Sequence, residues 1–259
     1  MKRTGPIFRK FYYILFSVLI LTVLSCTAAK PSGKKNSRAF RDMGNALFIQ
    51  GNPREALVNF LKAEKIDPGN HDIQNEIALV YQKIDQYDLA LLHYKKAIQL
   101  KPDFSEAYNN MGVLYSILGQ FDDALDCFNR ALSNILYKTP HFACHNIGLV
   151  YLEKNETEKA IEFFKKSIAI DPEYLEAYFD LAGVYEKSGR FNDVIDTYNK
   201  IMSLAPEALE ARLNLAKIYL KNGRKKEAAS EIDTIMRTDP RSPIAREAVK
   251  ILHDIQNNE

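Results

Sequence analysis

The sequence predicts an all-α fold, a right-handed superhelix of six helix-turn-helix repeats followed by a C-terminal capping helix. Small residues recur at spacings of 34, 34, 36, 34 and 34 residues: Gly44, Ala78, Gly112, Gly148, Ala182 and Ala216. A second series keeps the same spacing: Ala56, Ala90, Ala124, Ala160, Val194 and Ala228. Two small positions in a period near 34 residues are typical of stacked helical pairs, because only small side chains let two helices lie close together.

The residues that start and end each helix repeat with the same period. The six repeats start at Ser37, His71, Ser105, His141, Leu175 and Leu209. Residues that tolerate a left-handed backbone separate the two helices of each repeat: Gly51, Asp85, Gly119, Asn155, Gly189 and Gly223. A proline stops the second helix of five repeats: Pro68, Pro102, Pro172, Pro206 and Pro240. The repeats therefore occupy residues 37–242.

The core of each repeat is predicted from a bulky residue at its position 24: Phe60, Tyr94, Phe128, Phe164, Tyr198 and Ile232. After the last repeat, residues 243–259 read as a capping helix and a short tail. Apolar residues there keep helical spacing: Ile244, Ala248, Ile251, Leu252 and Ile255. Such a helix is expected because an end repeat has no neighbour to cover its apolar face.

Over residues 37–256 this pattern resembles the tetratricopeptide repeat family. The resemblance implies a superhelix whose first helices line a concave face. It also implies that the protein binds other proteins rather than catalysing a reaction.

The first 25 residues read as a lipoprotein signal peptide. Basic residues (Lys2, Arg3, Arg9, Lys10) precede an apolar stretch from Phe11 to Leu24, which is short for a membrane span. It ends in Val-Leu-Ser-Cys, which resembles the bacterial lipobox, so Cys26 is the expected site of lipid attachment, including palmitate. An uncleaved anchor is the alternative. By resemblance to Gram-negative sorting, Thr27 favours the periplasmic face of the outer membrane. Residues 26–36 are expected to form a flexible tether.

Charge and motifs exclude several classes of function. The chain has 35 Lys and Arg against 33 Asp and Glu, and removal of the signal peptide would leave a slightly acidic protein. We therefore expect no nucleic-acid partner. No nucleophile elbow, phosphate loop or metalloprotease helix is present, so we expect neither catalysis nor a cofactor.

Two cysteines and two histidines leave alternatives open. Cys127 and Cys144 lie on helices expected to be neighbours, so a disulfide is conceivable, although two separate thiols are favoured. His141 and His145, one helical turn apart, could share a metal ion. No matching further ligand is apparent, and we expect no metal site.

The candidate binding surface is the concave face, where inward positions that internal packing does not need carry apolar residues. These candidate partner-binding residues are Val113, Ile117, Phe142, His145, Leu149, Leu152, Phe179, Leu213 and Leu220. They suggest a groove for an extended or helical peptide. A few such residues also occur in arrays that bind nothing there.

The third repeat has two extra residues, within the stretch Asn134-Ile-Leu-Tyr-Lys-Thr-Pro140. This stretch resembles a segment at the same junction in the type IV pilus pilotin family (PilF/PilW/Tgl-like), although Ile135 replaces that family's proline. Its members are lipoproteins with six tetratricopeptide repeats. The resemblance implies a role in the localisation or assembly of the secretin, the channel through which the pilus leaves the cell. The alternative is a general envelope scaffold that recruits cell-wall enzymes or proteases.

Overall fold

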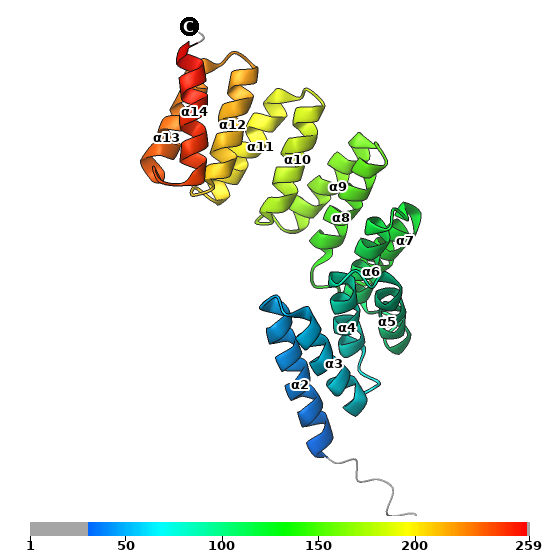
Figure 1. Cartoon of the computed structure of the whole chain (residues 1–259). Coiled ribbons are helices and arrows are strands. Elements are labelled where there is room, and N and C mark those ends of the chain that lie inside the picture. The colour runs from blue at the N-terminus through cyan, green and yellow to red at the C-terminus, as the bar shows by residue number, and fades with distance from the viewer. Residues whose placement is uncertain (1–30, 258–259) are drawn as a thin grey trace, which may run out of the picture. The chain divides into compact units, whose positions relative to one another are not determined.

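The computed structural model describes residues 31–257, where all regular structure is α-helical and no strand occurs. The helices are labelled α2 to α14 (Figure 1). Their bounds are α2 Pro31–Ile49, α3 Pro53–Ile66, α4 His71–Lys83, α5 Tyr87–Leu100, α6 Ser105–Ile117, α7 Phe121–Ser133, α8 Pro140–Glu153, α9 Thr157–Ile170, α10 Leu175–Lys187, α11 Phe191–Leu204, α12 Leu209–Lys221, α13 Lys225–Thr238 and α14 Pro243–Asn257. The all-α class predicted from the sequence is confirmed.

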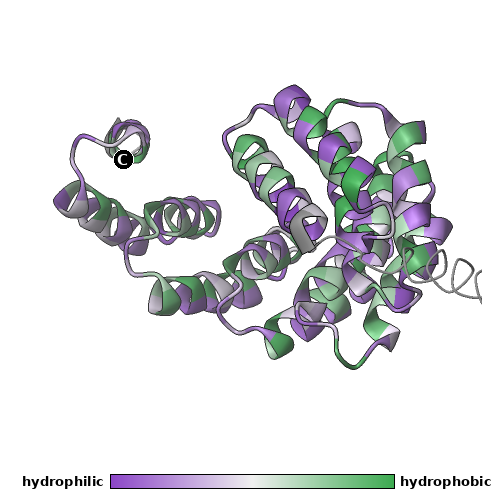
Figure 2. Cartoon of the chain, turned by 90° about the horizontal axis from the view of Figure 1, so that it is seen from below, coloured by the Kyte–Doolittle hydropathy of each residue, from purple (hydrophilic) through white to green (hydrophobic). Residues whose placement is uncertain are grey.

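The chain divides after Leu100 into two compact units. Unit 1 contains α2 to α5, and unit 2 contains α6 to α14. The even-numbered helices from α2 to α12 are the first helices of the repeats, here called A helices, and the odd-numbered ones are the B helices. Within each unit every A helix packs against its own B helix, and every B helix packs against the next A helix (Figure 1). Hydrophobic and hydrophilic residues alternate along these helices, as expected when one face is buried (Figure 2).

Four of the six predicted repeat starts, at His71, Ser105, Leu175 and Leu209, coincide with the first residue of an A helix. The fourth repeat begins one residue early, at Pro140. The first A helix differs more, because α2 begins at Pro31 and residues 31–36 of the predicted tether are helical. Proline is well tolerated in the first turn of a helix, and the lysines after it are good helix formers. Residues 1–30, with the predicted signal peptide and Cys26, lie outside the described residues.

The turn from each A helix to its B helix has one residue with positive φ. Asp85 and Asn155 both have φ of 59°. Glycine fills this place in the other repeats, at Gly51, Gly119, Gly189 and Gly223. The left-handed turn predicted from these residue types is therefore confirmed.

The core of each repeat forms where the small residue of the A helix meets the bulky residue of the B helix. A Cβ atom built on Gly44 would lie 2.6 Å from Cε1 of Phe60, so these helices are closer than an alanine would allow. Gly112 and Gly148 approach Phe128 and Phe164 in the same way. After the last repeat, α14 packs against α12 and α13 and buries Ala245 and Ala248.

None of the described helices is long and apolar enough to cross a membrane.

Candidate peptide-binding surface

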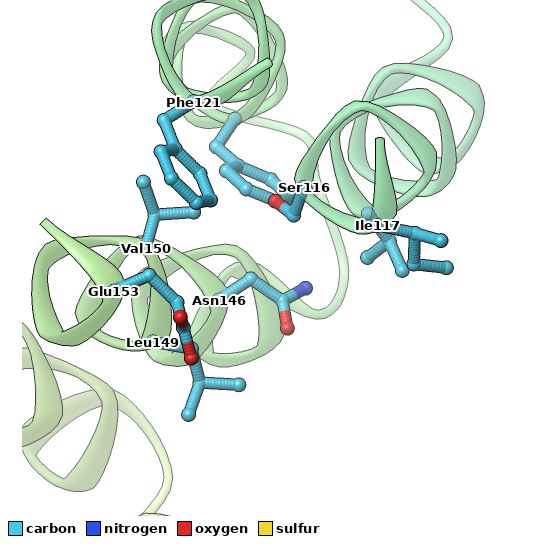
Figure 3. A pocket seen from close by; sticks show the side chains of 9 residues that line it. Ser116, Ile117, Phe121, Asn146, Leu149, Val150 and Glu153 are labelled. Carbon is cyan, nitrogen blue, oxygen red and sulfur yellow. The ribbon is translucent and has the colours of Figure 1, made fainter. Parts of the chain in front are cut away.

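A cavity of about 280 Å³ opens between two consecutive A helices of unit 2, α6 and α8, and α7 contributes to its lining (Figure 3). Its lining residues are Val113, Ser116, Ile117, Phe121, Phe128, Asn146, Leu149, Val150 and Glu153. Six of these nine are apolar, so the cavity favours an apolar occupant.

Helical spacing brings the lining residues together. On α6, Val113 and Ile117 are four residues apart and share one face. On α8, Asn146, Leu149 and Glu153 recur at intervals of three and four residues. Ile117 is 54% exposed and Leu149 is 36% exposed, so aliphatic side chains are accessible on both A helices.

The deeper part of the cavity comes from aromatic residues of α7. Phe128 is fully buried, and Phe121 is half-buried. In the close view Phe121 points towards Val150 of α8 (Figure 3). The deep part of the cavity is therefore apolar, and its shape depends on how these core side chains pack.

Three polar residues also line the cavity and can orient a bound segment through hydrogen bonds or charge. The Asn146 amide donates a hydrogen bond from Nδ2 to Oδ1 of Asn109, at 3.1 Å. Its side-chain oxygen can accept a hydrogen bond from a bound backbone N–H. The Ser116 hydroxyl donates to the carbonyl of Gly112 at 3.0 Å. Glu153 is exposed and is the one charged residue of the lining, so it favours a basic residue in a ligand.

A second group of predicted residues lies near the start of α8, beside Tyr174. His145 is buried, and its Nε2 lies 2.6 Å from Oδ2 of Asp180. The Tyr174 hydroxyl lies 3.3 Å from Nδ1 of His145. Burial, together with nearby carboxylates, raises the pKa of Tyr174 to about 12. The protonated Tyr174 hydroxyl can donate to Nδ1 when Nε2–H donates to Asp180.

Phe142 extends this group to the surface. Its ring lies 5.2 Å from that of Tyr174 in an edge-on arrangement and 4.2 Å from that of His141, between ring centroids. Phe142 is 39% exposed, whereas His145 is only 7% exposed. Phe142 can therefore contact a partner directly. The prediction that His145 lines an open groove is wrong, because it is buried and contacts Tyr174, against which Phe142 packs.

The remaining predicted residues belong mainly to the core of unit 2. Leu152, Phe179 and Leu220 are half-buried and pack against its buried cluster. Leu213 is only 4% exposed, so the prediction that it lines an open groove is wrong. The turn of α12 that carries it faces neighbouring helices of the same unit.

The cavity is also lined by residues outside the candidate partner-binding set predicted from the sequence. Ser116, Asn146, Val150 and Glu153 could have been found, because they lie within one helical turn of Ile117 or Leu149. Phe121 and Phe128 could not have been identified in this way, because they lie on a B helix, whose apolar residues are expected to pack in the interior.

The cysteines and histidines with open alternatives lie as follows. Cys127 and Cys144 are buried thiols and form no disulfide with each other. His141 and His145 pair with different carboxylates, those of Asp171 and Asp180. Within residues 31–257 no group of three or more His, Cys, Asp or Glu could hold a metal ion.

The inserted segment between α7 and α8 has a fixed base and an exposed tip. Asn134 Nδ2 donates to the carbonyl of Asp103 at 2.9 Å and to the Ser105 hydroxyl at 3.0 Å. Tyr137 is buried against the core of unit 2. Between them Ile135 is 95% exposed and Leu136 is 77% exposed.

Family models of the tetratricopeptide repeat match most of the repeat region. Residues 103–173 match one model described as tetratricopeptide repeat, and residues 151–207 and 187–252 match a second one. Residues 84–119 match a model described as TPR repeat. Among curated proteins, no sequence gave a match.

Several solved structures have a similar fold. PilF of Pseudomonas aeruginosa is 22% identical, with a TM-score of 0.69 over 83% of this chain and 97% of that one. PilW, described as a widely conserved type IV pilus biogenesis factor, is 24% identical, with a TM-score of 0.69 over 82% and 98%. YrrB, described as a TPR protein with an unusual peptide-binding site, is 19% identical, with a TM-score of 0.53 over 74% and 97%. At these identities the likeness concerns the fold.

Proposed function

We propose that this chain, which belongs to the tetratricopeptide repeat family, holds an apolar segment of a protein partner between α6 and α8. The observation that carries the proposal is the apolar cavity with accessible Ile117 and Leu149 at its lining. An aliphatic or aromatic side chain of the segment enters the cavity. The side-chain oxygen of Asn146 accepts a backbone N–H, and Glu153 favours a nearby basic residue.

The partner we propose is the type IV pilus secretin. Two lines support this choice. The fold is similar to those of PilF and PilW, and PilW is described as a pilus biogenesis factor. The stretch from Asn134 to Pro140 also resembles a pilotin segment. In this proposal Cys26 carries the lipid and holds the protein on the periplasmic face of the outer membrane, where it promotes secretin localisation or assembly.

The proposed secretin role is tested by measuring the amount of secretin multimers, which resist heat and SDS. They are compared by blot in outer-membrane fractions from wild-type cells, a deletion strain and a strain with Leu149→Lys. We expect multimers to be lost in the deletion strain and strongly reduced with Leu149→Lys, because the lysine replaces an apolar contact with the segment and, four residues from Glu153, occupies the carboxylate that would favour a basic residue of the partner. Ile170→Lys is the matched control, since Ile170 is 46% exposed on α9 outside the cavity.

Two further results complete this test. Cys26→Ala should keep the protein folded but reduce multimers in the outer membrane, because it removes the proposed lipid anchor. Unchanged multimers in the deletion strain would overturn the secretin role. If a photoreactive residue at position 149 were then cross-linked mainly to cell-wall enzymes, the function as an envelope scaffold would be favoured instead.

A further inference from the structure

The outer faces of the two B helices of unit 1 expose aliphatic side chains. On α3, Val58 is 51% exposed and Leu61 is 39% exposed. On α5, Leu89 is 39% exposed and Leu92 is 48% exposed. Each pair is three residues apart and therefore lies on one face of its helix. We call these four residues the aliphatic patch.

The equivalent positions in unit 2 are polar. Val58 and Leu92 occupy the same position in their repeats, and the exposed residues at that position in the later repeats are Asp126, Glu162, Asp196 and Ser230. The repeat fold therefore does not require an apolar residue there. The aliphatic patch is a property of unit 1 and needs its own explanation.

Lysines follow the aliphatic residues on both helices. Lys62 and Lys65 continue the α3 face, and Lys95 and Lys96 continue the α5 face. Lys96 Nζ lies 4.0 Å from Oε1 of Glu64, which links α5 to α3. Residues 31–100 contain 10 Lys and Arg against 8 Asp and Glu, whereas residues 101–259 contain 20 against 25. Unit 1 is therefore the basic part of an otherwise acidic chain.

We propose that this face of unit 1 docks on an anionic lipid bilayer. The aliphatic patch enters the interface between headgroups and acyl chains, and the four lysines contact lipid phosphates. Helices that lie on membranes combine aliphatic residues with lysine in this way. The centres of protein interfaces instead are depleted in lysine and enriched in aromatic residues, and the patch has no aromatic residue.

The docking surface requires neither a membrane span nor a lipid anchor. It is also compatible with lipidation of Cys26, which is part of the proposed function. Helix α2 begins five residues after Cys26, and five residues reach at most about 17 Å. A lipid on Cys26 would thus hold α2 near the bilayer and strengthen a contact that is weak by itself.

The absence of tryptophan from the chain allows a position-specific test. Leu92→Trp places a single probe in the aliphatic patch, and Glu162→Trp places one at the equivalent position of unit 2. Both full-length chains are mixed with vesicles of phosphatidylethanolamine and phosphatidylglycerol that carry brominated acyl chains. We expect the Leu92→Trp emission to shift to shorter wavelength and to be quenched, while the Glu162→Trp emission stays unchanged.

Charge reversal tests the role of the lysines. Replacing Lys62, Lys65, Lys95 and Lys96 by Glu in the Leu92→Trp chain should abolish quenching, because each lysine near an anionic surface strengthens binding roughly fivefold. Circular dichroism checks that this variant is folded. High salt should weaken quenching in the same way.

Three results would overturn the proposal: no quenching at position 92, equal quenching at both positions, or quenching that persists after charge reversal. The vesicles contain no secretin, so the outcome is independent of the secretin test. Membrane docking can therefore fail while the peptide-binding function stands, and the reverse also holds.

Discussion

Three glycines of the A helices lie against phenylalanine rings of the B helices. These pairs are Gly44 with Phe60, Gly112 with Phe128 and Gly148 with Phe164. The other three repeats combine an alanine at the first position with tyrosine or isoleucine at the second: Ala78 with Tyr94, Ala182 with Tyr198 and Ala216 with Ile232. In the three glycine repeats the phenylalanine ring occupies the space that an alanine methyl group would need, so glycine is required there.

Gly44→Ala tests this pairing. The new Cβ would lie 2.6 Å from the Phe60 ring, which must shift inside a packed core. We expect the free energy of unfolding to fall by about 1–3 kcal/mol, as for other overpacked cores. Adding Phe60→Ile should restore part of this loss, because it reproduces the combination of Ala216 with Ile232. Urea unfolding measures both changes, and an unaltered midpoint for Gly44→Ala would contradict the account.

His93 is a buried residue that connects three helices of unit 1. Its Nδ1 lies 2.8 Å from Oε1 of Gln74, and Nε2 of Gln74 donates to Glu64 at 2.9 Å. Burial lowers the pKa of His93, and the charge of Lys96 lowers it further. The neutral imidazole is therefore the form that the folded protein favours.

The depressed pKa makes stability depend on pH. An unfolded histidine titrates near pH 6.5, whereas folded His93 titrates at lower pH. Between these two values the unfolded chain binds a proton that the folded chain does not, so acidification favours unfolding. We expect the stability of the wild type to fall more steeply than that of His93→Gln as the pH decreases from about 7 to 5. Identical slopes in urea unfolding at several pH values would contradict this.

The segment between α7 and α8 shows how an insertion is held in place. Asn134 anchors its base through Asp103 and Ser105, and Oδ1 of Asn134 also accepts a hydrogen bond from the backbone N–H of Leu136 at 2.9 Å. Tyr137 anchors the other side in the core. The two extra residues shift the neighbouring helix ends by one residue, since α7 has 13 residues where the other B helices have 14, and α8 begins one residue early at Pro140.

Asn134→Ala should therefore destabilise unit 2, because it leaves the Ser105 hydroxyl and the Asp103 carbonyl without this donor. We expect a loss of about 1–3 kcal/mol in the free energy of unfolding. Ile135→Ser is the control in the same segment. Since Ile135 is 95% exposed, its replacement should change stability by less than about 0.5 kcal/mol. Equal effects of the two substitutions in denaturant unfolding would be inconsistent with the anchoring role of Asn134.

Most helix boundaries could be predicted because the residues that set them are local. Gly, Asn or Asp ends each A helix, and proline follows most B helices, so the periodic pattern places these ends directly. The start of α2 could not be predicted in this way. The sequence before Ser37 has no repeat partner to compare with, and its composition also suits a flexible linker.

The cavity was predictable only in part. Val113, Ile117 and Leu149 line it as inward positions of A helices. Its depth depends on Phe121 and Phe128 of α7 and on the distance between α6 and α8. The periodicity of the sequence does not give that distance. Leu213 has an inward position too, yet it is buried. Position within a repeat thus gives the direction of a side chain, while neighbouring helices decide its exposure.

At the scale of the whole molecule, two surfaces with different chemistry suggest two kinds of contact. Unit 2 offers an apolar cavity between A helices, suited to one side chain of a bound segment. Unit 1 offers aliphatic and lysine residues on its B helices. A protein that binds a partner while it rests on a membrane would use both surfaces. The central claim concerns the first of them, the binding of a partner segment in the cavity.

Site-specific photo-cross-linking in living cells tests that claim most directly. A photoreactive residue replaces Leu149 at the cavity in one strain and Ile170 of α9 in another. The account predicts a cross-linked product that contains the secretin at position 149 and none at position 170. A secretin product from position 170 alone would contradict it, and so would the absence of any protein product from position 149.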